Sequence, residues 1–143
     1  MKVGMASDHA GFELKAALKE YLSAKGYEVL DYGTDSGESV DYPDFAHPLA
    51  NSVEQGTVSF GIAICGTGNG ICMTANKHQG VRGALCWLPE IAALAKQHNN
   101  ANLIAMPARF ISVDQAKEIL DAYMNASFEG GRHQRRIDKI AVK

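Results

Sequence analysis

The sequence contains few cysteines, no excess of either charge and no long apolar run. Its three cysteines are Cys65, Cys72 and Cys86; because their number is odd and none forms a CxxC pair, a disulfide framework is excluded. Fourteen Lys and Arg residues against sixteen Asp and Glu residues give a net charge of −2, which excludes the basic footprint of a nucleic-acid or membrane-surface binder. No apolar run has the length that a bilayer span needs.

The first residues also lack the apolar core of a secretory signal, because only a few apolar residues precede Ser7 and Asp8. We therefore expect a cytoplasmic protein with reduced thiols. The 143 residues fit one domain, residues 1–143, and the 46% of hydrophobic and 21% of charged residues are ordinary for a globular protein.

Short apolar runs alternate with amphipathic stretches along the chain. The pattern predicts strands at residues 2–6, 27–32, 58–65, 81–87 and 102–106. It predicts helices at residues 11–25, 44–55, 69–78, 89–98, 113–124 and 132–140. Repeated strand–helix units predict an α/β fold, a Rossmann-like three-layer α-β-α sandwich with a five-stranded parallel sheet. In such sheets the site lies beyond the carboxyl ends of the strands.

A glycine-rich loop follows the third predicted strand. Gly66, Gly68 and Gly70 alternate with Thr67 and Asn69 just before a helix. Glycines let backbone N–H groups approach an anion closely, and a helix N-terminus adds positive potential. A tight turn or a generic nucleotide loop explains the same glycines, but the spacing is not the GxGxxG of dinucleotide-binding proteins. We therefore expect an anion site and not a dinucleotide site.

Cys65 ends that strand, against the glycine loop and the start of the next helix. Such a position favours the thiolate form, which can act as a nucleophile or a base. The commoner fate of a free cysteine is that of a small buried hydrophobe. We assign that fate to Cys72 and Cys86, which lie inside apolar patterns, and a functional role to Cys65.

Two arginines, Arg132 and Arg136, stand four residues apart on the last predicted helix, so both lie on one face. Two guanidinium groups on one face suit a phosphate, which they can hold through paired hydrogen bonds. A solvated basic face is the usual meaning of clustered charge, and we assign it to Arg135 and Lys139.

Further polar residues follow other strands and helices. Asp8 and His9 come after the first strand, His98 and Asn99 end a helix, and Arg109 follows the fifth strand. His98 can move a proton near neutral pH, although a capping or surface role is equally consistent with the sequence. Asp8 could cap the next helix. No pair of His, Cys or Asp residues shows zinc-ligand spacing, so we predict no metal and no cofactor.

Together these residues resemble the ribose-5-phosphate isomerase B family, which also includes allose-6-phosphate and galactose-6-phosphate isomerases. The resemblance covers essentially the whole chain, and its matching segments are residues 7–11, 41–43, 65–68, 75–77, 98–99 and 129–133 with Arg136. It implies a metal-free aldose–ketose isomerase that interconverts ribose 5-phosphate and ribulose 5-phosphate through a cis-enediolate. It also implies a homodimer or a dimer of dimers, with a site at the subunit interface to which the partner contributes His98, Asn99 and Arg109.

The same resemblance implies the roles of the residues. Cys65 is the base that moves a proton between C1 and C2, Thr67 bonds the reacting oxygens and His98 assists ring opening. The phosphate end is held by Arg132 and Arg136 with Arg109. The substrate-binding residues that it implies are Asp8, His9, Tyr42, Gly66, Gly68, Asn69, Gly70, Asn99, Arg109, Arg132 and Arg136. Asn69 stands where the family commonly has an apolar residue, and Pro107-Ala108 stands before Arg109 where glycine is more usual.

Three alternatives fit part of the pattern. A six-carbon sugar phosphate, as in allose-6-phosphate or galactose-6-phosphate isomerase, would use the same residues in a deeper pocket. A non-catalytic module that binds nucleotides or phosphoesters would use the glycine loop and the arginines, but it would not need Cys65, Thr67 and His98 together. A subunit that is active only beside a related chain is the third.

Overall fold

Five parallel strands form the middle layer of the molecule, in the order β2-β1-β3-β5-β4. The computed structural model describes residues 1–142. The strands are β1 (Lys2–Ser7), β2 (Glu28–Asp31), β3 (Phe60–Cys65), β4 (Gly83–Leu85) and β5 (Leu103–Pro107). All six residues of the central strand β3 are buried, as expected for a parallel strand that is covered on both faces.

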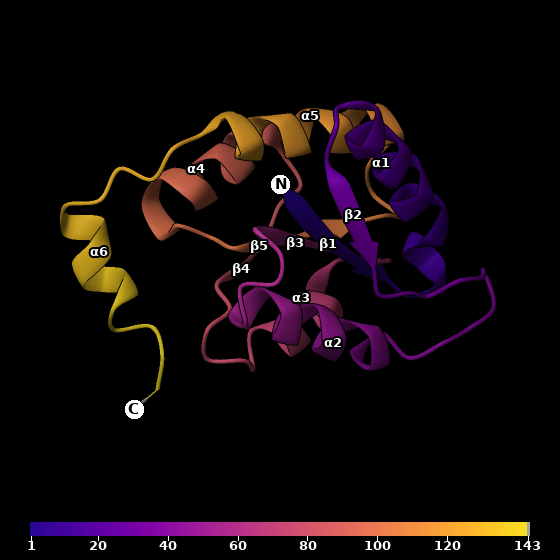
Figure 1. The fold of residues 1–143 in the computed structure, drawn as a ribbon, viewed down its shortest axis with the longest axis horizontal. Helices are drawn as coiled ribbons and strands as arrows, with labels where there is room; N and C mark the ends of the chain where they lie inside the picture. Colours follow the sequence, from indigo (N-terminus) through magenta and orange to yellow (C-terminus); the bar gives the residue numbers. More distant parts are fainter. Residues whose placement is uncertain (143) are drawn as a thin grey trace.

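Helices cover both faces of this sheet (Figure 1). One face carries α1 (Phe12–Ala24), α4 (Pro89–Asn99) and α5 (Val113–Asn125), and the other carries α2 (Pro43–Glu54) and α3 (Asn69–Ala75). A 3-10 turn η1 (His9–Gly11) precedes α1, and a short helix α6 (Arg132–Ile137) lies beyond α5, at the left of Figure 1. The predicted fold class and order of elements are confirmed. In residues 1–142, no helix is both long enough and apolar enough to cross a bilayer.

The two faces of the sheet carry side chains of different size. Large side chains of β3 pack against α1, α4 and α5, namely Phe60, Ile62 and Ile64. Small residues face α2, namely Gly4, Ala6, Gly61 and Ala63. A Cβ added at Gly4 would lie 2.6 Å from Leu49 Cδ1 on α2. Helix α2 therefore lies close to the strands because these residues have little or no side chain.

The predicted boundaries of β4 and α3 extend too far. Helix α3 ends at Ala75, where the sequence pattern predicts residue 78, and β4 covers only Gly83–Leu85 of the predicted 81–87. The side chain of Asn76 accepts a hydrogen bond from Gly83 N (2.8 Å) and donates one to Gly83 O (3.0 Å). This amide therefore satisfies the free edge of β4, where another strand would otherwise pair. Helix α6 also ends early, at Ile137 and not at residue 140.

Candidate active site at the carboxyl edge of the sheet

The glycine loop lies at the carboxyl end of β3, as predicted. Cys65 is the last residue of the strand and is buried. Gly68 has φ of +77° and caps α3, a left-handed conformation that favours glycine. The Thr67 hydroxyl accepts a hydrogen bond from Asn69 N (3.2 Å) at the start of the helix. The remaining first-turn N–H groups of α3 have no acceptor within the helix and can bind an anion.

Tyr42 and Arg109 flank the loop in the same chain. A Cβ added at Gly70 would lie 2.5 Å from Tyr42 Cζ, and one added at Gly66 would lie 3.0 Å from Arg109 Nη1. The backbone N–H of Arg109 also donates to Gly66 O (3.0 Å). The loop glycines therefore admit these two side chains. Arg109 lies beside the loop of its own chain, in contrast to the expectation that a partner chain supplies it.

A hollow of about 620 Å³ opens beside the loop. The predicted site residues among its lining are Asp8, His9, Tyr42, Gly66 and Arg109. The rest of the lining comes from Ala10, from the loop that precedes α2 and from the first residues of that helix. The hollow lies where the βα loops of a parallel sheet usually place a substrate.

Asp8 and His9 are each fixed by backbone groups. Asp8 Oδ1 accepts hydrogen bonds from Ala10 N (3.0 Å) and Gly11 N (3.3 Å), so Asp8 caps η1 as well as lining the hollow. His9 Nδ1 accepts a hydrogen bond from Val40 N (3.1 Å). A neutral imidazole whose Nδ1 accepts carries its proton on Nε2. His9 therefore has an N–H free to donate to an anion in the hollow.

The other predicted site residues lie at the opposite end of the sheet. Helix α4 runs back from the carboxyl edge, and His98 and Asn99 at its end lie close to the start of β5. Cys65 pairs with Pro107 at the other end of β5, and a five-residue strand spans about 16 Å. Arg132 and Arg136 lie on α6, which packs against α4. One chain therefore does not bring these four residues to Cys65.

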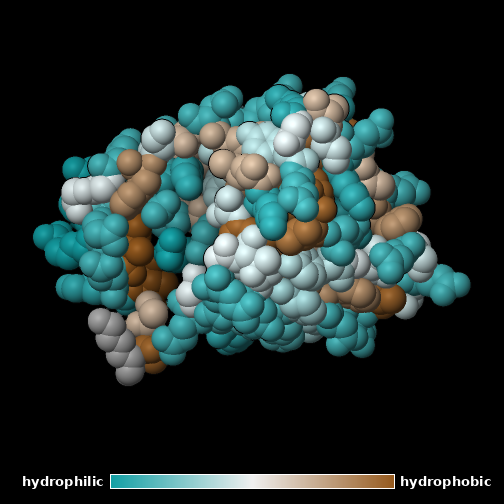
Figure 2. Space-filling view, viewed as in Figure 1, coloured by the Kyte–Doolittle hydropathy of each residue, from teal (hydrophilic) through white to brown (hydrophobic). Residues whose placement is uncertain are grey.

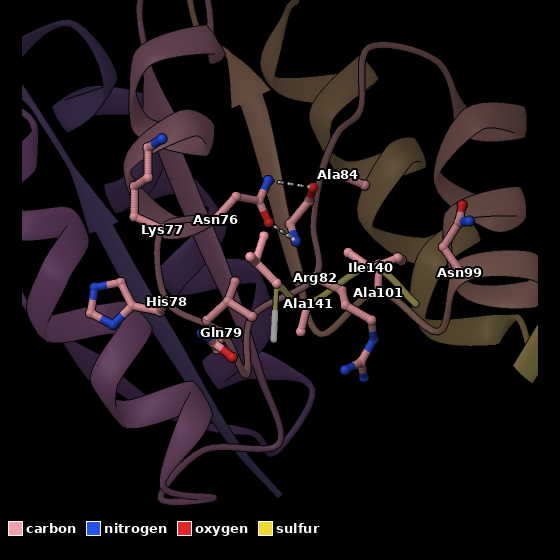
Figure 3. A pocket seen from close by; sticks show the side chains of 13 residues that line it. Asn76, Lys77, His78, Gln79, Arg82, Ala84, Asn99, Ala101, Ile140 and Ala141 are labelled. Carbon is pink, nitrogen blue, oxygen red and sulfur yellow. Dashed lines mark hydrogen bonds between the residues drawn. The ribbon is translucent and has the colours of Figure 1, made fainter. Parts of the chain in front are cut away.

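Asn99 borders a second hollow of about 490 Å³, between the end of α3, the edge strand β4 and the C-terminal segment (Figure 3). Arg82 and Ile140 also line it, and the dashed lines at Asn76 in Figure 3 mark the two hydrogen bonds that join this side chain to the backbone of Gly83. Figure 2 shows an apolar strip beside α6 in the same part of the molecule.

Two residues near His98, Glu129 and His133, lie in a segment that matches the family, but the sequence analysis gave neither of them a role. Glu129 Oε1 lies 3.7 Å from His98 Nε2 and 3.5 Å from His133 Nε2, and the two imidazoles stack with centroids 4.3 Å apart. One ligand atom from each of the three side chains lies within 4.8 Å of the others. The search for zinc-ligand spacing missed this group because His98 lies 31 residues before Glu129 in the chain. The absence of a metal stays a prediction.

The other two cysteines fit the structural role assigned to them. Burial raises the pKa of Cys72, and it raises the pKa of Cys86 to about 12. Both side chains therefore stay protonated thiols at neutral pH and serve as small core residues.

Comparison with known proteins relates the whole chain to sugar-phosphate isomerases. The model of the ribose/galactose isomerase family matches residues 3–140. Ribose-5-phosphate isomerase B of Escherichia coli is 45% identical over 141 residues, which cover 99% of this chain and 95% of that protein.

Solved structures agree with this relationship. The ribose 5-phosphate isomerase of Thermotoga maritima has a TM-score of 0.96 and 50% identity, covering 98% of this chain and 97% of that one. Ribose-5-phosphate isomerase B of Mycoplasma genitalium, solved with bound ribulose-5-phosphate, has a TM-score of 0.94 and 46% identity, covering 97% and 93%. The chain therefore belongs to the ribose/galactose isomerase family, as an isomerase of the ribose-5-phosphate isomerase B type.

Proposed function

We propose that this isomerase interconverts ribose 5-phosphate and ribulose 5-phosphate, with Cys65 as the base that transfers the proton. The observation that carries the proposal is the position of Cys65, at the end of β3 and directly before a glycine loop that borders the hollow. The bound ribulose-5-phosphate of the Mycoplasma genitalium relative supports this substrate.

The chemistry needs one base and one anion site. In the open-chain aldose, the Cys65 thiolate takes the proton from C2, and the electrons of that C–H bond form the C1–C2 double bond of a cis-enediolate. Return of the proton to C1, with transfer of the hydroxyl proton from O2 to O1, gives the ketose without net oxidation. Backbone N–H groups of residues 66–70 and the Thr67 hydroxyl stabilise the negative oxygens, and each such donor is worth about 3–4 kcal/mol in comparable sites.

The phosphate is held at the far end of the substrate. His9 offers its Nε2–H, and Arg109 lies beside Gly66 in the same hollow. Arg132 and Arg136 supply paired guanidinium donors, which suit the oxygens of a phosphate. Binding of the phosphate end keeps C1 and C2 of the flexible sugar at Cys65. This orientation lowers the activation barrier of the proton transfer.

A complete site requires two copies of the chain. In one copy, His98, Asn99, Arg132 and Arg136 lie at the opposite end of the sheet from Cys65. We infer a homodimer, or a dimer of dimers, in which the α4–α6 end of one protomer faces the Cys65 loop of its partner. The hollow beside Asn99 and Ile140 is the surface that supports this docking. A cytoplasmic location stays a prediction.

The test is an isomerase assay with Cys65→Ser and, as the matched control, Cys72→Ser. Cys65→Ser is expected to remain folded and to lose nearly all turnover, since general base catalysis contributes about 10²–10⁴-fold. Cys72→Ser is expected to stay active. Full activity of Cys65→Ser would overturn the proposal. Binding of the sugar phosphate without any turnover by the wild type would favour the non-catalytic module.

The substrate is tested by comparing kcat/KM for ribose 5-phosphate, allose 6-phosphate and galactose 6-phosphate. The proposal expects the highest value with ribose 5-phosphate. A higher value with either six-carbon sugar would replace the substrate and leave the role of Cys65 intact.

A further inference from the structure

We propose that Glu129 and His133 are positioning residues that hold the His98 imidazole for the opening of the sugar ring. This inference rests on the proposed function, because it deepens the role of His98 in that reaction. It assigns a task to two residues that contact neither Cys65 nor the glycine loop.

The Glu129 carboxylate lies beside the stacked histidines, near the Nε2 atom of each ring. Its Oε1 atom is 3.7 Å from His98 Nε2 and 3.5 Å from His133 Nε2. A carboxylate attracts a ring N–H, so the proton of a neutral His98 stays on Nε2. Nδ1 is then the nitrogen of His98 that exchanges a proton with the substrate. At 3.7 Å the carboxylate acts on His98 through its charge and favours the Nε2–H tautomer.

His133 fixes the plane of the His98 ring. The two imidazoles stack with centroids 4.3 Å apart and an interplanar angle of 10°. The side chain of His133 is 11% exposed, whereas that of His98 is 40% exposed. The buried ring is therefore the fixed support, and the half-exposed ring in contact with it is the one that faces a ligand.

The backbone brings the three side chains together. Glu129 N donates to Gln97 O (3.0 Å), which pins the α5–α6 connection to the end of α4. Gly130 and Gly131 then have φ of +70° and +58°, a left-handed turn that favours glycine. His133 N donates to Gly130 O (3.2 Å) and closes the turn. The same turn starts α6, the helix that carries Arg132 and Arg136. One turn therefore positions both the His98 imidazole and the two arginines proposed to bind the phosphate.

The ring geometry favours positioning over metal chelation. The lone pair of an imidazole nitrogen lies in the ring plane, and a bound ion must lie near that plane. Two nearly parallel stacked rings have no common in-plane point at a bonding distance of about 2.0–2.1 Å. The cluster therefore orients His98 through charge and stacking.

The two substrates differ in whether they need ring opening. Ribose 5-phosphate closes through O4 onto C1. When the ring opens, the C1–O4 bond breaks, C1=O1 forms, one proton leaves O1 and one reaches O4, with no net oxidation. Ribulose 5-phosphate has a phosphate on the oxygen that would close its five-membered ring, so it remains an open chain. Only the reaction from the aldose begins with the step assigned to His98.

The experiment measures two rates for Glu129→Gln and His133→Phe: kcat/KM for ribose 5-phosphate, and exchange of the C1 hydrogen of ribulose 5-phosphate with solvent deuterium, which needs only the proton transfer by Cys65 and no ring step. The first substitution removes the charge, and the second keeps a flat ring for stacking without Nε2. We expect both to lower kcat/KM for ribose 5-phosphate about tenfold and the exchange rate less than about threefold. Glu118→Gln, an exposed charge loss on α5, is the matched control and is expected to change neither value.

His98→Asn separates failure of this inference from failure of the proposed function. If His98→Asn loses isomerisation but keeps hydrogen exchange and the other two variants do not, the positioning role is wrong and the function stands. If His98→Asn loses isomerisation and exchange equally, or loses neither, the ring-opening role fails, and this inference with it. An equal loss of isomerisation and exchange for Glu129→Gln and His133→Phe would show that they only dock α6. Loss of wild-type activity in EDTA would assign the cluster to a metal and overturn the inference.

Discussion

The phenol ring of Tyr42 lies directly against Gly70, so a Cβ added at residue 70 would come within 2.5 Å of Tyr42 Cζ. Helix α2 begins right after Tyr42, whereas Gly70 is in the first turn of α3. The contact therefore sets the distance between the two helices that enclose the glycine loop.

Gly70→Ala is expected to displace Tyr42 and to misplace the loop beside it. A displacement of about 1 Å can cost about 10²-fold in rate, so we expect kcat/KM to fall by one to two orders of magnitude. Gly37→Ala is the control, because a Cβ there would meet no atom within 4 Å. Steady-state kinetics of both variants check this, and equal kinetics for the two would contradict the packing argument.

Mixing two inactive variants tests whether the site is shared between protomers. Cys65→Ser and His98→Asn are each expected to be inactive with ribose 5-phosphate as homodimers. After unfolding and refolding together, half of the dimers combine one of each, and each of these contains one intact site. We expect about a quarter of wild-type activity to return. If the mixture stays inactive while wild type treated in the same way recovers, Cys65 and His98 do not meet across a subunit boundary.

The arginines of α6 differ in their expected effect on KM. Arg132→Ala and Arg136→Ala each remove a paired donor to the phosphate and are expected to raise KM by about 10–100-fold. Arg135→Ala removes the same charge from the same helix and is expected to change KM by less than about twofold. A KM for Arg135→Ala that rises as much as the others would mean that total charge, and not position, governs binding.

The ion pair of Lys15 and Asp31 predicts how stability depends on pH. Lys15 Nζ lies 2.5 Å from Asp31 Oδ1, and its side chain is 2% exposed. Burial alone would raise the pKa of Asp31, but hydrogen bonds from Lys15 and Gly33 N, with the charges of Lys15 and Lys19, outweigh it and lower the pKa below its ordinary value. The pair therefore stabilises the fold fully above the ordinary carboxyl pKa of about 4, and this stability is lost as the pH falls through the lower folded value.

Lys15→Met should thus destabilise the protein by about 3–5 kcal/mol at pH 7, because it leaves a half-buried carboxylate without its main partner. The difference from wild type should shrink below about pH 4, where the carboxyl of the variant is protonated. Lys19→Met, at a residue that is 46% exposed and 3.5 Å from Asp31 Oδ2, should cost less than about 1 kcal/mol. Urea unfolding across pH 3–7 measures both. A pH-independent difference would show that Lys15 acts by packing alone.

Local patterns were sufficient for the order of the elements. The apolar run that ends at Cys65 is typical of a buried strand, and the amphipathic stretches have the residue period of helices. In the structure they form β3 and the helices that cover the sheet. The boundary errors arise from side-chain contacts that periodicity does not contain. Asn76 ends α3 and bonds the edge of β4, so both elements are shorter than their apolar runs.

The site was only partly predictable for the same reason. The glycine loop with Asp8 and His9 could be placed together, because the carboxyl ends of parallel strands share an edge. Arg109 follows β5 and so reaches the same edge, where its N–H donates to Gly66 O; the expectation that a partner chain supplies it came from the family resemblance. The contact of Glu129 with His98 depends on how α6 docks on α4, and no motif spacing records it.

The small residues that face α2 affect the width of the substrate-binding hollow. Because Gly4 has no side chain, Leu49 can pack directly on the strands. Leu49 lies on α2, the helix that begins right after Tyr42. A methyl group added at Gly4 would meet Leu49 and push α2 away from the strands. We therefore expect substitutions on this face of the sheet to change the width of the hollow through α2, without changing any residue that contacts the substrate.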